Sequence, residues 1–257
     1  MFSREGSARS DRQNRLLAGY LAFVGGYVNS SGFVLVGTYT SHVTGNVGRM
    51  ANAAARGEYT AALAALTMVF SFFIGAFCVT MIVETGIFGR GSRAYANALL
   101  AEALLLIVFT SLSYLTMKLR FSLRDMEALS LCAAMGMQNG LVTRLSGAVV
   151  RTTHLTGVVT DLGIEAARWF RYWRGSLGQV AHLPMLFGQN NADRPALPKS
   201  LLLLTIAGAF LIGALIGAVL AVQFKHASML FAAAALIAGT IYARREAPNS
   251  EKLSIAP

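Results

Sequence analysis

Long apolar stretches without charged side chains constrain this chain most strongly. Three of them reach 20 or more residues, and about 20 helical residues are needed to cross a hydrocarbon core of about 30 Å. A transmembrane barrel would instead show segments of about 10 residues that alternate apolar and polar, a pattern that the sequence lacks. We therefore expect an all-α integral membrane protein with six transmembrane helices, at about Leu16 to Val36, Ala61 to Val83, Ala94 to Met117, Met126 to Val142, Leu201 to Val222 and Ser228 to Ala243.

The charged residues fit this interpretation. Of the 257 residues, 55% are hydrophobic and 13% are charged, whereas about 25% are charged in an ordinary soluble domain. With the amino terminus in the cytoplasm, sixteen of the 22 Lys and Arg residues fall in cytoplasmic segments and six outside. Because cytoplasmic segments retain Lys and Arg, both termini are expected to be cytoplasmic. Topology then explains the net charge of +10, and no nucleic-acid partner is needed.

Signal and cysteine patterns add little. The first apolar run is longer than the core of about 7 to 15 residues of a cleaved secretory signal, so we expect it to stay in the mature protein. Cys78 and Cys132 both lie in apolar stretches and show no metal-ligand spacing. We expect them to be packing residues, with neither a disulfide nor a metal site, and we expect no cofactor.

Three short matches recur in the same order in the two halves of the sequence. Gly26 to Asn29 corresponds to Gly136 to Asn139, at an offset of 110 residues. The segments 40–45 and 152–157 share the pattern Thr-(Ser/Thr)-His-x-Thr-Gly at an offset of 112, and 72–76 corresponds to 210–214 at an offset of 138. An insertion in the second half explains the larger offset.

The matches predict an internal repeat within one membrane domain, residues 1–257. Repeat one covers about 16–117 and repeat two about 126–243, with an amphipathic helix and a loop at about 158–199. Because three spans per repeat is an odd number, the second repeat enters the membrane from the opposite side. Such inverted-topology repeats are common in secondary transporters, whose sites lie near the midplane where interrupted segments meet.

The amphipathic helix is predicted at Thr153 to Arg174. Its apolar residues, among them Trp169, Phe170 and Trp173, recur at helical spacing opposite several arginines. Such a helix suits the cytoplasmic lipid interface, where rings lie at headgroup level and cations meet anionic lipid. Packing on the spans, with a solvated charged face, is an equally good interpretation.

The motif residues resemble the YoaK-like family, bacterial inner-membrane proteins that carry a domain of unknown function. The resemblance rests on His42 to Asn46, on Gln138 to Gly140, on Arg151 to Gly157 and on Thr160 to Gly163. It covers about Leu16 to Ala243 and implies a six-span protein of the bacterial inner (plasma) membrane. It implies no activity.

Two histidines occupy equivalent repeat positions beside threonines. His42 with Thr44, and His154 with Thr156, offer donors and acceptors to a small solute. Alternatively, Thr or Ser caps a helix start, the histidine bonds a carbonyl group, and glycine allows a turn. A metal site is less favoured, because two histidines without a third ligand do not define a coordination shell.

Four further polar residues are candidates for a substrate or ion pathway. Asn29 and Asn139 lie inside expected spans and should face another helix or a cavity. Glu102 lies about eight residues into the third span, where a carboxyl group must pair, coordinate or take up a proton. Asp161 follows the second motif and is a candidate for an inner gate.

The leading hypothesis is a small-solute transporter or permease with its site at the repeat interface, using a solute or a proton. The alternative is a membrane scaffold that recruits a partner or lipid through the amphipathic helix. An enzyme is not expected, because no nucleophile with an adjacent base appears. Gly213 and Gly217 form a Gly-x-x-x-Gly pattern that suits packing within the bundle or a homo-oligomer.

Overall fold

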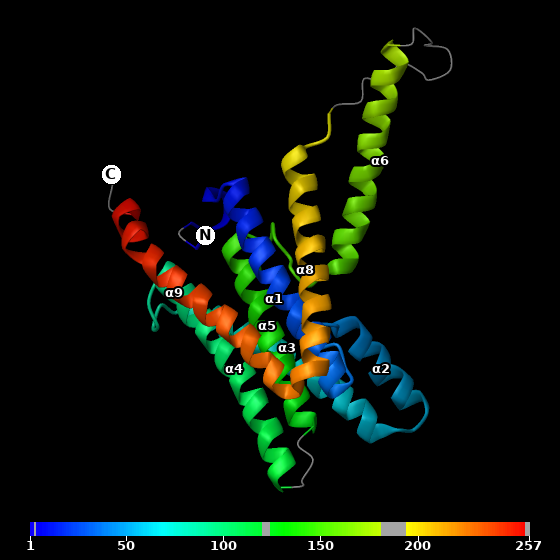
Figure 1. Cartoon of the computed structure of the whole chain (residues 1–257), viewed down its shortest axis with the longest axis vertical. Helices are drawn as coiled ribbons and strands as arrows, with labels where there is room; N and C mark the ends of the chain where they lie inside the picture. Colours follow the sequence, from blue (N-terminus) through cyan, green and yellow to red (C-terminus); the bar gives the residue numbers. More distant parts are fainter. Residues whose placement is uncertain (3, 120–123, 181–193, 255–257) are drawn as a thin grey trace.

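The protein is a bundle of long helices (Figure 1). The computed structural model describes residues 1–2, 4–119, 124–180 and 194–254, and every regular element within these ranges is helical, which confirms the all-α prediction. Each predicted span overlaps one of these helices, but α9 continues eleven residues beyond Ala243, the predicted end of the sixth span. The elements are η1 (Gly6–Ala8), α1 (Asp11–Val36), α2 (Val43–Ala55), α3 (Tyr59–Glu84), α4 (Ser92–Leu119), α5 (Arg124–Ser146), α6 (Leu155–Val180), α8 (Leu197–Phe224), η2 (Lys225–Ser228) and α9 (Met229–Ser254).

The ends of α1 follow from local sequence. The hydroxyl of Ser10 accepts a bond from the backbone N–H of Gln13 at 3.3 Å, and the Gln13 side chain accepts one from the Ser10 N–H at 3.1 Å. This reciprocal capping box satisfies two amide donors at the start of the helix. At the other end, Gly37 takes the left-handed conformation with φ of 76° and donates its N–H to Phe33, as helix-terminating glycines do.

One end of the bundle gathers the start of α4 and the ends of α3, α5 and α9. The Ser92 hydroxyl donates to the carbonyl of Phe2 at 3.0 Å, and the Phe2 N–H donates to Glu246 at 2.6 Å. Arg144, near the end of α5, bonds Glu84 at the end of α3 at 3.2 Å. We call this end the terminal end, because the chain begins there.

The opposite end joins the lower part of α4 to the starts of α5 and α9. The Thr110 hydroxyl of α4 contacts the carbonyl of His226 at 3.4 Å, and the His226 ring lies 3.9 Å from the Glu127 carboxylate of α5. Helices α1, α3, α4, α5, α8 and α9 therefore alternate in direction along the chain. In Figure 1, α1 runs away from the terminal end and α9 returns to it.

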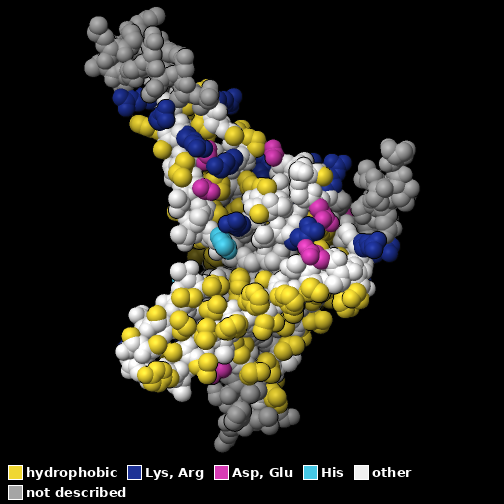
Figure 2. Space-filling view, turned by 180° about the vertical axis from the view of Figure 1, so that it is seen from behind, with side chains coloured by type: hydrophobic (Ala, Val, Ile, Leu, Met, Phe, Trp, Pro, Cys, Tyr) yellow, Lys and Arg dark blue, Asp and Glu magenta, His cyan; other side chains and the backbone are white. Residues whose placement is uncertain are grey.

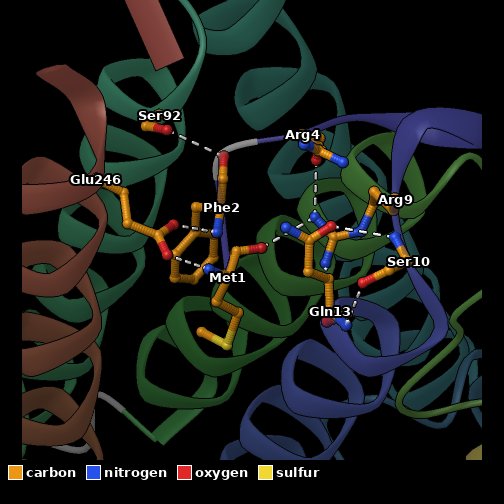
Figure 3. Close-up of polar contacts among 8 residues, drawn as sticks. All are labelled: Met1, Phe2, Arg4, Arg9, Ser10, Gln13, Ser92 and Glu246. Carbon is orange, nitrogen blue, oxygen red and sulfur yellow. Dashed lines mark hydrogen bonds and ion pairs between the residues drawn. The ribbon is translucent and has the colours of Figure 1, made fainter. Parts of the chain in front are cut away.

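The amino-terminal segment is tucked into the terminal end (Figure 3). Its Phe2 side chain is buried, and the Met1 ammonium group pairs with Glu246 of α9. The Arg9 guanidinium donates to the carbonyls of Met1, Arg4 and Gln13 and to the side chain of Asn14, at 2.7 to 3.0 Å. These bonds fix the segment across α1, α4 and α9.

Three helix pairs form the core: α1 with α8, α3 with α5, and α4 with α9. Close approach in the first two pairs depends on glycine. A Cβ atom on Gly213 of α8 would overlap the carbonyl oxygen of Phe23 in α1, and one on Gly75 of α3 would overlap that of Ala133 in α5. The Gly-x-x-x-Gly prediction of packing within the bundle is confirmed, since Gly217 also lies against the backbone of Tyr27.

These glycine contacts occur in matched form in the two halves. Gly26 of α1 touches the carbonyl of Phe210 in α8, and Gly136 of α5 touches that of Phe72 in α3. Gly136 lies 110 residues after Gly26, and Phe210 lies 138 residues after Phe72. The two contacts therefore join the same two repeated positions. Helix α1 of the first half thus packs on α8 of the second half, and α5 of the second half packs on α3 of the first. In both cases the partner helix contains the repeated Phe-x-Ile-Gly-Ala sequence.

Much of the bundle surface is apolar. Large side chains that are 54 to 62% exposed include Leu63, Phe73 and Ile74 of α3 and Leu211 and Leu215 of α8. Figure 2 shows an apolar region on one face, with Lys and Arg side chains above it. Exposed apolar surface of this extent marks a lipid or protein contact.

Four helical stretches are long and apolar enough to cross a membrane: Asp11–Val36, Tyr59–Glu84, Ser92–Leu115 and Leu197–Glu246. The last contains both α8 and α9. Helix α5 is not among them, because polar and charged residues interrupt its apolar sequence. These stretches are what a membrane protein requires.

The structure differs from the sequence prediction at two places. Arg49 and Arg56 were assigned to a connection, but residues 43–55 form the helix α2 and Arg56 ends it. Lys199, assigned to the loop after the amphipathic helix, already belongs to α8, because Pro198 occupies its first turn. The rest of that predicted loop largely lies outside the described residues.

Candidate functional site

The site is built where two helices break. The first break is residues 37–42, between α1 and α2, and the second break is residues 147–154, between α5 and α6. The two repeated Thr-(Ser/Thr)-His motifs fall at the ends of these breaks, so that α2 and α6 begin at equivalent positions, Val43 and Leu155. Both breaks follow a helix that carries an asparagine seven residues before its end.

Each of these asparagines is bonded to its own break. The Asn29 side-chain oxygen accepts bonds from the N–H and the hydroxyl of Ser41 at 3.1 and 3.0 Å. The Asn139 side-chain oxygen accepts a bond from the hydroxyl of Thr153 at 2.6 Å, and its amide donates to the carbonyl of Met135. We expected both amides to face another helix or a cavity; the structure bonds each side-chain oxygen to the motif residue that precedes the histidine.

Both breaks rest on α1. A Cβ atom on Gly25 would lie 2.8 Å from the Gln138 side-chain oxygen and 3.3 Å from the methyl group of Thr153, so the second break rests on this glycine. Two turns further along α1, a Cβ atom on Gly32 would lie 3.0 Å from the methyl group of Thr40 in the first break. Glycine at both positions lets the broken segments approach the helix backbone.

Three buried side chains at the breaks have polar atoms without a hydrogen-bond partner. They are the Thr40 hydroxyl, the Thr152 hydroxyl and both amide atoms of Gln138, and these residues are 1%, 0% and 0% exposed. Thr40 and Thr152 stand at the same position of the two motifs. An unpaired buried polar group costs about 1 to 3 kcal/mol, so these groups are suited to a polar solute.

The predicted histidines lie at the rim of the site. His42 and His154 are both exposed and immediately precede α2 and α6. The alternative reading, in which the motif caps a helix through its side chains, is wrong for α2, because no side-chain capping bond is present at His42. Glycine does not make a turn here either, since Gly45 and Gly157 lie within the helices.

The threonines Thr44 and Thr156, also predicted to line the site, are exposed in the first turns of α2 and α6. Asp161 is half-buried in the second turn of α6. These three residues therefore lie beyond the breaks, on the helices that leave them. In each motif, the first threonine, two residues before the histidine, is buried, and the threonine two residues after the histidine is exposed.

Glu102 lies elsewhere in the bundle. It is 1% exposed in α4, and neither of its carboxylate oxygens has a hydrogen-bond partner. Its electrostatic neighbour is Tyr20 of α1, whose hydroxyl donates to the carbonyl of Ala235 in α9 at 2.9 Å. The structure thus places Glu102 near the contact of α1, α4 and α9, apart from the residues that join α1 to the breaks.

Two arginines lie beside the breaks. Arg49 of α2 reaches back to the Thr38 hydroxyl at 2.9 Å. Arg151 belongs to the second break, where partial loss of hydration and then the Arg151 charge lower the pKa of His154. His154 is therefore neutral at neutral pH.

Helix α6 is fixed by an ionic contact to α8. The Glu165 carboxylate, 3% exposed, lies 3.2 Å from Lys199 and 2.8 Å from Arg168. Burial alone would raise the pKa of Glu165, but hydrogen bonds and charges from Lys199 and Arg168 outweigh it, and the pKa is lowered. The Trp169 indole donates to the Ser200 hydroxyl at 3.1 Å. Beyond this contact α6 extends away from the bundle (Figure 1).

The surface is indented between the arm that contains α6 and the arm that contains α2 (Figure 2). Both arms begin at the breaks. No group of three or more His, Cys, Asp and Glu side chains able to hold a metal ion occurs in the part of the chain that the structure describes. The described side chains at the breaks therefore provide hydrogen bonds from hydroxyl and amide groups and the positive charges of two guanidinium groups.

Sequence reasoning found the asparagines but missed Thr40, Thr152 and Gln138 as site residues. All three lie in the repeated segments, and the repetition of Thr40 as Thr152 was a usable signal. Arg49 was missed because α2 was not predicted as a helix, and a helical side chain points back towards the start of its helix.

Comparison with known proteins gives a family and no activity. No curated protein and no solved structure matches the chain. A family model described as protein of unknown function, DUF1275, matches residues 17–243. This range contains both breaks and all the long helices except the first turns of α1 and the last turns of α9. The chain belongs to the DUF1275 family.

Proposed function

We propose that the protein is a small-solute transporter or permease with six spans, arranged as two inverted-topology repeats, and with its site at the two breaks. Its location would be the bacterial inner membrane, with both termini in the cytoplasm. We propose no enzymatic activity. A homo-oligomer is compatible with this function, because the exposed faces of α3 and α8 can meet lipid or a second copy.

The arrangement of the helices supports an inverted repeat. Helices α1, α3 and α4 alternate in direction, and α5, α8 and α9 do so in the opposite sense. The glycine contacts between the halves are matched, as in the Gly26–Phe210 and Gly136–Phe72 pairs. In repeats of this kind the site lies where interrupted helices from the two halves meet.

The single observation that carries the proposal is the set of unpartnered polar atoms on Thr40, Thr152 and Gln138. Buried polar groups in folded proteins are nearly always bonded, so three such residues at equivalent breaks indicate a place for a bound molecule. A solute that accepts and donates hydrogen bonds would satisfy them. The indentation between α2 and α6 supplies a route on one side.

The arms suggest how access would alternate. Helices α2 and α6 each leave a break and pack on the following helix of their own half, α3 and α8. Rocking of the α1–α8 pair against the α3–α5 pair would move α6, which packs on α8, relative to α2, which packs on α3, and would leave the glycine contacts within each pair intact. Alternating access by rocking of repeats is the usual mechanism in such folds.

A scaffold function is the second candidate, and one observation favours it. On α6, Phe170 and Trp173 are 64% and 60% exposed, and Arg171 and Arg174 are exposed as well. An apolar and basic helix of this kind binds anionic lipid or an acidic partner. Loss of function on replacing these four residues, with the site residues intact, would favour the scaffold.

The test is a thermal-shift screen of the detergent-solubilised protein against small metabolites and ions, on the native chain and on a Thr40→Val/Thr152→Val double variant. Because the variant removes two unpaired hydroxyl groups, it should be at least as stable as the native protein without ligand. A solute that stabilises the native protein should stabilise the double variant less.

The matched control is Thr110→Val in α4. Its hydroxyl is also buried but already donates to the carbonyl of Leu106 at 3.1 Å, so its removal should leave the solute response unchanged. A double variant that is less stable and keeps the full solute response would contradict the proposed site. No response of the native protein to a broad panel would shift the balance to the scaffold.

A further inference from the structure

We infer that the solute held at the two breaks is a small anion. The inference rests on the proposed function and names the chemical class of its substrate. It follows from two independent features of the breaks: the direction of the helices that leave them and the charges beside them.

Two helices begin at the breaks. The first N–H groups of α2 and α6 have no partner within their helices, and the helix dipole places partial positive charge at each start. His42 leaves the N-terminal turn of α2 without a side-chain cap. The first turns of both helices contain no acidic side chain that would neutralise the dipole. Two helix starts with partial positive charge, one from each half, would attract one negative charge.

A helix start alone does not make a site, but buried donors lie beside these two. The Thr40 and Thr152 hydroxyls and the Gln138 amide have no partner. The Gln138 side chain ends against Gly25, where the Thr153 methyl group also lies, so its amide is at the second break. Each of the three groups can donate to a carboxylate or an oxyanion.

The nearest charges are positive. Arg49 bonds Thr38 in the first break, and Arg151 lies in the second break, where its charge acts on His154. Among the described acidic residues, α2 has none, and Glu165 of α6 is paired with Lys199 and Arg168. Asp161, half-buried in the second turn of α6, is the acidic group closest along the chain. Two guanidinium groups outweigh this one carboxylate.

Two of the oxygen atoms that could bind a cation at the breaks are already engaged. The Asn29 oxygen accepts two bonds from Ser41, and the Asn139 oxygen accepts one from Thr153. A desolvated metal cation is held by several oxygen ligands at once. The hydroxyl oxygens of Thr40 and Thr152 and the side-chain oxygen of Gln138 remain without a partner. The preference for an anion therefore rests on the two helix starts and the two guanidinium groups.

The experiment measures thermal stability and binding heats of the full chain in detergent at constant ionic strength. Sodium gluconate in the buffer is replaced stepwise by sodium nitrate, formate or sulfate. Potassium and tetramethylammonium gluconate test cations, and acetamide and glycerol test neutral solutes. The Thr40→Val/Thr152→Val variant corrects for the general effect of salts on stability.

At least one of the three anions should stabilise the native protein more than the double variant. Arg49→Gln and Arg151→Gln should each raise its Kd by about tenfold, which corresponds to about 1.4 kcal/mol. Arg56→Gln and Arg171→Gln are the matched controls, because they remove the same charge from the far end of α2 and from the middle of α6. The controls should leave Kd within about twofold, since exposed charges farther than a Debye length of about 10 Å are screened.

Equal effects of the four arginine variants would overturn the inference, because the anion would then respond to net charge alone. Stabilisation by a cation or a neutral solute that is lost in the double variant, with no anion effect, would also overturn it and leave the proposed site in place. No effect of any probe overturns the anion inference and removes support from the site itself.

Discussion

Arg151 and His154 lie in the same break, three residues apart, and the arginine charge acts on the imidazole. Because partial desolvation and this charge both lower the pKa of His154, removing the charge removes one of the two causes. We predict that Arg151→Gln raises the pKa of His154 part of the way to the ordinary value of about 6.5. Histidine-selective NMR titration measures the shift, with the signal assigned from a His154→Gln variant.

Arg171→Gln is the control for this titration, because Arg171 is exposed further along α6. It should leave the His154 titration unchanged. An unchanged titration in Arg151→Gln would mean that loss of hydration alone sets the imidazole pKa. The second break would then lack the positive field on which the anion inference depends.

At the residue scale, the sequence drew attention to the segments that form the breaks, but the buried and unpartnered atoms there belong to residues that it did not single out. His42 drew attention because imidazole binds and titrates, whereas its neighbour Thr40 is a common residue type. Only the three-dimensional structure shows that Thr40 is 1% exposed and unpartnered while His42 faces outwards. Burial at a break depends on the helix that the segment rests on, here α1 at Gly32, and no local pattern carries that information.

At the scale of the helix, glycine sets the distance between α1 and α8. We predict that Gly213→Ala lowers the free energy of unfolding by about 1 to 3 kcal/mol, the usual cost of overpacking, because the new methyl group would overlap the Phe23 carbonyl. Thermal unfolding in detergent measures the change. The equivalent Gly75→Ala change, against Ala133, should have the same sign.

Gly208→Ala provides the control on the same helix. Nothing lies within 4 Å of the position that its Cβ would occupy, so the better helix propensity of alanine, worth up to about 1 kcal/mol, should leave stability unchanged or higher. Equal effects of the Gly208 and Gly213 changes would show that close packing at Phe23 contributes nothing to stability.

Helix boundaries show which elements could be predicted. The strongly apolar α3 and α8 were located to within a few residues, because lipid-facing and core-facing surfaces are both apolar and the whole run is visible. Helix α2 was missed, since its thirteen residues include two asparagines, two glycines and Arg49. It is held by contacts with α3 and by the bond between Arg49 and Thr38, which are tertiary features.

At the scale of the whole molecule, basic residues gather at the terminal end. Arg9, Arg144 and Arg244 all bond groups at this end, and Figure 2 shows Lys and Arg above the apolar region on the face in view. Because Lys and Arg are retained in the cytoplasm, this end should face inwards. Sequence matches predicted an inverted repeat, whereas the crossed pairing of α1 with α8 and of α3 with α5 depends on glycine contacts that only the structure displays.

Single cysteines test this orientation in a chain from which Cys78 and Cys132 have been replaced by serine and alanine. Glu58→Cys and Ala227→Cys lie at the end opposite the termini, and Arg90→Cys and Arg194→Cys lie on the terminal side. We predict that a membrane-impermeant maleimide labels the first two in intact cells and the second two only after permeabilisation. All four should label in permeabilised cells, which controls for reactivity.

Labelling of Glu58→Cys and Ala227→Cys from opposite sides would exclude the inverted repeat, because the α2–α3 and α8–α9 connections must then face different compartments. Labelling of all four positions with sides exchanged would keep the repeat and reverse the orientation, so that the basic end would face outwards.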